Sequence, residues 1–112
     1  MPGDLEGRTE TVIDTGLAYR PGDAVRVRVI RRPAHRVEIT DDGGAIERAG
    51  KPAGWRDVAA QLERELIVNI SRRGVVSLPV VGAGPDEDVV IARIAEASLA
   101  LYDELLELSV LA

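Results

Sequence analysis

Two runs of alternating apolar and charged residues constrain the fold more than any other part of the chain. Within Ala24–Arg31, three valines alternate with arginines, and Arg36–Thr40 repeats the alternation with Val37 and Ile39. Successive side chains of a strand point to opposite faces, so both runs predict strands with one buried face and one face in water. The turn Arg32–His35 joins them into a β-hairpin.

Two later segments predict helices. Trp55–Leu66 places its apolar residues on one stripe at helical spacing. Asp86–Leu111 is longer and opens with three acidic residues, which suit a helix N-terminus through capping and the helix dipole. Between these helices, Ile67–Ser71 and Val75–Leu78 flank a turn in which Gly74 supplies the positive φ, and they predict a second hairpin.

The remaining segments complete the predicted architecture. Thr9–Tyr19 is rich in β-branched residues and favours a strand with a bulge at Gly16, with a short helix as the alternative. Ala45–Ile46 either starts a short third strand or leads into a loop. Pro79 has no amide hydrogen, which places the last strand at a sheet edge. The order (β)ββ(β)αββα predicts an α+β fold, an antiparallel or mixed sheet of two hairpins with two helices packed on one face.

The length and composition define the class of protein. A chain of 112 residues predicts one domain, here residues 9–112 after a flexible N-terminal segment of residues 1–8. The chain has no cysteine, which excludes disulfides and thiolate metal sites. The first residues are polar and acidic, unlike a signal peptide, and no apolar run of about 18 residues occurs. We therefore expect a cytoplasmic protein without membrane contact and without a cofactor.

The arginines of the first hairpin are the first candidate binding set. They are expected on its exposed face and tip, and comprise Arg26, Arg28, Arg31, Arg32 and Arg36. Such a set can bind phosphate, nucleic acid or an acidic protein surface. The net charge of −5 argues against general nucleic-acid binding. The simpler interpretation is a solvated face balanced by nearby acids.

The last predicted helix carries more apolar surface than one sheet can cover. One stripe comprises Val90, Ile94, Ala97, Leu101, Leu105 and Leu108. A second comprises Ile91, Ala95, Leu99, Tyr102, Leu106 and Val110. A helix laid on a single sheet needs only one such stripe. The surplus predicts a homodimer whose interface includes Ile91, Leu99, Tyr102, Leu106 and Val110.

The run Val37–Ile46 resembles the domain of unknown function 1828 family, which comprises small bacterial and phage domains. The shared feature is a hairpin strand that ends in the tetrapeptide Thr40–Gly43, and the turn Pro21–Asp23 is also similar. The likeness covers roughly residues 19–108. This chain departs from the family by continuing with Gly44 and by a long Gly/Pro loop before the helix that contains Trp55. The resemblance implies no activity, because the family has none established.

Asp41 and Asp42 are the remaining candidates for chemistry. Adjacent carboxylates could ligate a divalent cation or supply a general base, but the calcium-loop pattern is absent. The alternative is a turn whose side chains bind local amides. The sequence therefore favours a non-enzymatic, homodimeric interaction module that could also bind another protein. The alternatives are a nucleic-acid-associated or mobile-element regulator that uses the arginine face, and a metal-dependent enzyme centred on the two aspartates.

Overall fold

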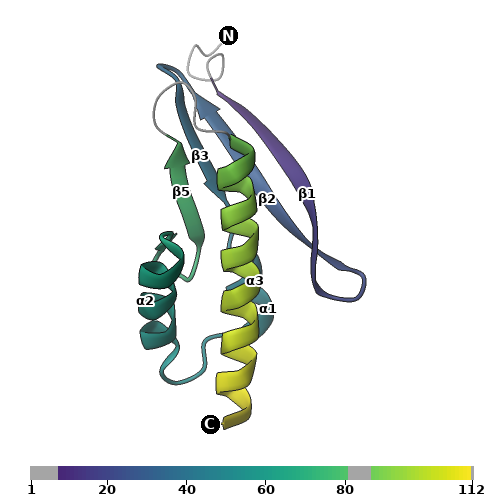
Figure 1. Ribbon diagram of the computed structural model, residues 1–112, viewed down its shortest axis with the longest axis vertical. Coiled ribbons are helices and arrows are strands. Elements are labelled where there is room, and N and C mark those ends of the chain that lie inside the picture. The colour runs from purple at the N-terminus through teal and green to yellow at the C-terminus, as the bar shows by residue number, and fades with distance from the viewer. Residues whose placement is uncertain (1–7, 81–86, 112) are drawn as a thin grey trace.

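A five-stranded antiparallel sheet carries one long helix across one of its faces (Figure 1). The computed structural model describes residues 8–80 and 87–111. The sheet order is β1-β2-β3-β5-β4. The elements are β1 (Thr9–Arg20), β2 (Asp23–Arg32), β3 (Arg36–Thr40), α1 (Gly44–Ala49), α2 (Trp55–Leu66), β4 (Asn69–Ile70), β5 (Val76–Val80) and α3 (Glu87–Leu111). The predicted α+β class is confirmed. The expected flexible N-terminus lies outside the described residues, except for Arg8.

The first hairpin forms as the alternation predicts. Val29 of β2 lies opposite Ile39 of β3, and both side chains are buried on the face that α3 covers. The ambiguous segment at the start of the chain is strand β1, antiparallel to β2. Its register shifts between Asp14 and Ala18, and Gly16 has φ +82°, so the expected bulge is present.

The sequence predicts the start of a strand or a loop at Ala45–Ile46. This prediction is wrong, because the segment is part of helix α1. The chain leaves β3 through two left-handed residues, Asp42 (φ +55°) and Gly43 (φ +75°), which turn it out of the sheet. Gly50 ends the helix with φ +78°, and its amide donates to the carbonyl of Ile46. Burial of Ala45 and Ile46 in the core stabilises this short helix.

The prediction that Pro79 marks a sheet edge is wrong in strand order, because β5 lies between β3 and β4. The physical reason is the short length of β4. Its two residues pair only with Val76 and Ser77, whereas Pro79 lies opposite Glu38 of β3. The proline therefore sits beyond the end of β4, where no outer neighbour requires its missing amide hydrogen.

Helix α3 supplies much of the core. Ile94, Leu101 and Leu105 of the first predicted stripe are fully buried. The C-terminal half of α3 extends past the sheet and lies beside α2, with α1 also packed against the helix (Figure 1). None of the described helices combines the length and apolar character needed to cross a membrane.

The residue that caps the C-terminus of α2, Ile67, has a strained backbone conformation that substitution by glycine should relieve. Ile67 has φ +56° and ψ +56° and is 68% exposed. The left-handed conformation costs a residue with a Cβ about 1–2 kcal/mol. We expect Ile67→Gly to raise the free energy of unfolding by about 1 kcal/mol, measured by urea denaturation. Ile67→Ala keeps the Cβ and is the matched control. An equal gain in both variants would contradict a conformational origin.

Candidate functional site

The five arginines of the first hairpin do not share one face of the sheet. The face opposite α3 carries four of them, namely Arg26, Arg28, Arg32 and Arg36. Arg31 lies on the α3 side, and its two terminal guanidinium nitrogens both donate to the carboxylate of Glu87, one of them at 2.7 Å. Strand alternation thus groups Arg31 with the buried valines and not with the other arginines.

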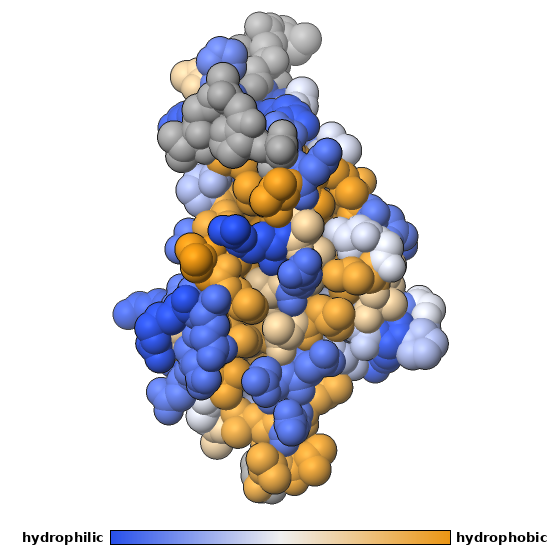
Figure 2. Space-filling model, in the orientation of Figure 1, coloured by the Kyte–Doolittle hydropathy of each residue, from blue (hydrophilic) through white to orange (hydrophobic). Residues whose placement is uncertain are grey.

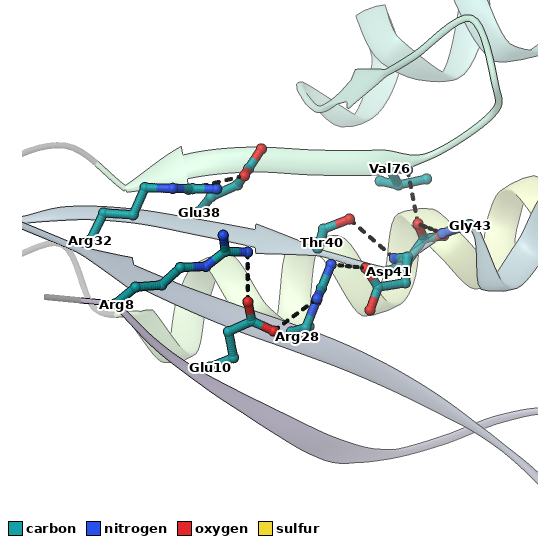
Figure 3. Close-up of polar contacts among 10 residues, drawn as sticks. Arg8, Glu10, Arg28, Arg32, Glu38, Thr40, Asp41, Gly43 and Val76 are labelled. Atoms are coloured by element: carbon teal, nitrogen blue, oxygen red, sulfur yellow. Dashed lines mark hydrogen bonds and ion pairs between the residues drawn. The ribbon is translucent and has the colours of Figure 1, made fainter. Parts of the chain in front are cut away.

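Arg28 is the centre of an ion-pair chain on the face opposite α3 (Figure 3). Its guanidinium donates to Glu10 at 2.8 Å and to Asp42 at 2.7 Å, and Arg8 also contacts Glu10 at 2.6 Å. The hydrogen bond from Arg28 lowers the pKa of Glu10. Desolvation opposes the charge on Arg28, but the two carboxylates outweigh it and raise the pKa of this guanidinium. These ion pairs therefore link three segments, because Glu10 lies in β1, Arg28 in β2 and Asp42 in the turn after β3.

Further along the same face, Arg32 contacts Glu38 at 3.4 Å (Figure 3). Arg26 and Arg36 make no ion pair with any residue that the structure describes. Acidic partners thus offset much of the positive charge of the predicted arginine set. This offset weakens the attraction of the face for a phosphate backbone.

The two aspartates that end β3 lie in different environments. Asp42 is exposed and pairs with Arg28 on the face opposite α3. Asp41 is only 3% exposed and bonds toward the interior. Their carboxylates therefore do not converge on one cation. Within residues 8–80 and 87–111, no three histidine, aspartate or glutamate side chains form a group that could hold a metal ion.

Asp41 connects the turn after β3 to β5 and α3, which are distant in sequence. One carboxylate oxygen accepts the amide hydrogens of Gly43 at 2.8 Å and of Val76 at 2.9 Å. The other oxygen accepts the hydroxyl of Ser98 in α3 at 2.6 Å. The Asp41 amide in turn donates to the carbonyl of Val76 at 3.0 Å. Figure 3 shows Asp41 with Gly43 and Val76 at the point where β3 ends and β5 begins.

Tyr19 extends this network toward the end of β1. Its hydroxyl lies 2.7 Å from Oγ of Ser98. An ionised carboxylate can only accept hydrogen bonds, so Ser98 donates to Asp41 and receives the hydrogen of Tyr19. The Tyr19 ring packs against Tyr102, with centroids 5.2 Å apart, and the guanidinium of Arg48 lies 4.7 Å from its centroid. Burial raises the pKa of both Tyr19 and Asp41.

A small hollow of about 160 Å³ lies beside this network, partly lined by Tyr19 and Asp41. Its rim carries both signs of charge, since Arg26 and Arg48 lie near Glu47. The charge of Arg48 is already paired with Asp23 at 2.7 Å. The hollow therefore favours neither an anion nor a cation.

The hydroxyl at the centre of the buried polar network is closed to solvent. Ser98 has no exposed surface, so a substrate in solution cannot reach its hydroxyl. Sequence reasoning missed the role of Ser98, although one signal was available. Ser98 is a polar residue at a position of α3 where helical periodicity requires a buried side chain, and a buried hydroxyl needs a partner.

The predicted dimer stripe on α3 is divided by the fold. Tyr102 is buried in the core of the chain itself, which does not fit the expectation that it faces a partner. Ile91 and Leu99 are half-buried. Leu106 is 39% exposed and Val110 is 84% exposed. Only the C-terminal members of the stripe are therefore freely available to a partner.

Comparison of the chain with protein-family models, curated protein sequences and solved structures found no match. The resemblance of Thr40–Gly43 to the domain of unknown function 1828 family therefore stays a prediction.

Removal of the Ser98 hydroxyl should destabilise the fold. Ser98→Ala leaves a buried oxygen of Asp41 and the Tyr19 hydroxyl without their shared partner. We expect a loss of about 1–3 kcal/mol in the free energy of unfolding, measured by urea denaturation. Ser109→Ala on the exposed side of α3 is the matched control, because it makes the same side-chain change without breaking a buried hydrogen bond and should not lose stability. Equal effects of both substitutions would rule out the network.

The raised pKa of Asp41 predicts a distinct pH dependence of stability. The unfolded carboxyl has its ordinary pKa of 3.8, and burial raises the pKa of the folded carboxyl above that value. Between the two values the folded state binds more protons, so acidification favours folding at this site. We expect wild type to gain stability relative to Asp41→Asn as the pH falls toward 3.8. Urea denaturation across this window measures the difference, and a wild type whose stability stays constant or falls relative to Asp41→Asn would contradict the prediction.

Proposed function

We propose that the protein is a non-enzymatic interaction module of the cytoplasm that works as a homodimer through the C-terminal half of α3. The observation that carries the proposal is an apolar stripe on that helix, in which Leu106 and Val110 are exposed and Leu99 is half-buried. The absence of cysteine from the sequence is compatible with a reducing compartment.

The stripe follows from helical geometry. At about 100° per residue, these three residues fall within about 40° of one another around the helix axis. Leu101 and Leu105 lie on a different side and are buried in the core. Apolar side chains gather around the C-terminal end of α3, where the helix passes beyond the sheet (Figure 2). An apolar stripe on a projecting helix is a typical contact surface between proteins.

The two alternative functions receive less support from the contacts. A nucleic-acid role depends on the arginine face, where Glu10, Asp42 and Glu38 already engage Arg28 and Arg32. A metal-dependent reaction needs both aspartates on one cation, but Asp42 pairs with Arg28 at the surface and Asp41 bonds to Ser98 in the interior. The interaction module is therefore the function that we retain.

Analytical ultracentrifugation tests the proposed dimer. We expect wild type at tens of micromolar to sediment with twice the mass of the chain. The double variant Leu106→Glu with Val110→Glu should sediment as a monomer, because two charges would enter an apolar interface. Val89→Glu is the control for one added charge, since Val89 is 55% exposed on another side of the same helix. A monomeric wild type, or equal dissociation of both variants, would refute the interface.

A further inference from the structure

Strand β1 forms one border of the sheet. Among the strands that the structure describes, only β2 pairs with it, which leaves the other backbone edge of β1 without a described partner strand. Residues Thr9–Asp14 pair with β2 without a register shift, and this stretch contains no proline. A regular edge strand of this kind leaves a row of amide and carbonyl groups free to pair with another strand.

A groove of about 400 Å³ lies between β1 and α3, next to this edge. Ile13 and Leu17 line it from the β1 side. Ile91, Ala92 and Ala95 line it from the α3 side. An added strand beside β1 would therefore find both backbone partners and an apolar surface for its side chains.

The charges around the groove indicate the chemistry of its occupant. Of the residues in 8–80 and 87–111, three acidic ones line it, Asp14, Asp88 and Glu96, and no basic one does. A second copy of the chain would bring the same acids toward these, and like charges would repel. A partner with lysine or arginine side chains would instead complement the groove.

We propose that the β1 edge and its groove bind an extended segment of another protein that carries an apolar residue between two basic ones. Asp88 and Glu96 are eight residues apart, which corresponds to about 12 Å along a helix. In an extended strand, residues four positions apart are separated by about 13 Å and point to the same face. A segment with the pattern basic-x-apolar-x-basic would thus place its central side chain in the groove and its charges near the two acids.

A titration followed by nuclear magnetic resonance tests this surface. The probe is the peptide threonine-lysine-threonine-valine-threonine-lysine-threonine with blocked ends. We expect it to shift the amide signals of Thr9–Asp14 and Ile91–Glu96. A peptide with glutamate in place of lysine should not bind, because its charges meet the acids of the groove. A peptide N-methylated at the threonines next to valine should bind more weakly, because it loses amide donors.

Charge-reversal variants separate this site from the proposed dimer interface. Asp88→Lys with Glu96→Lys should weaken the lysine peptide by about tenfold or more and leave the oligomeric state unchanged. Glu104→Lys with Glu107→Lys makes the same charge change at exposed positions of α3 outside the groove, and should alter affinity by less than about twofold.

Three outcomes would overturn the proposal. The lysine peptide could fail to shift the named signals, or both charge-reversal variants could weaken it equally. The reversal at Asp88 and Glu96 could instead change the oligomeric state, which would assign the groove to a second copy of the chain.

Loss of dimerisation in the Leu106→Glu and Val110→Glu variant with retained peptide binding would show that the two surfaces are separate.

Discussion

The buried carboxylate of Asp41 is the interaction on which the arrangement of the elements depends. Removing a charge from water is costly unless hydrogen bonds replace the lost hydration. Asp41 gains such bonds from the Gly43 amide, the Val76 amide and the Ser98 hydroxyl. Each donor belongs to a different part of the chain, so solvating this one group fixes the turn after β3, the start of β5 and the position of α3 together.

The position of α3 decides which of its residues can meet a partner. With Ser98 held against Asp41 and Tyr19, the helix keeps Tyr102 in the core and leaves Val110 in solvent. The same orientation of α3 places the N-terminal part of the helix beside β1, where the groove forms. The network thus orients the surfaces that we propose to be functional.

Sequence periodicity predicted the regular elements because each depends on local alternation or helical spacing. It assigned the hairpin of β2 and β3, the helix α2 and the helix α3. It failed at Ala45–Ile46, since two left-handed residues redirect the chain there and only core packing stabilises so short a helix. It misplaced Pro79 because strand order depends on pairing between distant segments and on the length of β4.

The sequence by itself determined the fold class, the buried face of the first hairpin and the apolar surplus of the last helix, because these follow from residue periodicity and composition. Only the tertiary structure decided that Asp41 and Asp42 have separate roles, that Arg31 pairs with Glu87, and that β1 borders a groove. These features depend on contacts between residues far apart in the chain. A linear pattern does not specify such contacts. At Asp41 the requirement to pair a buried charge specifies them.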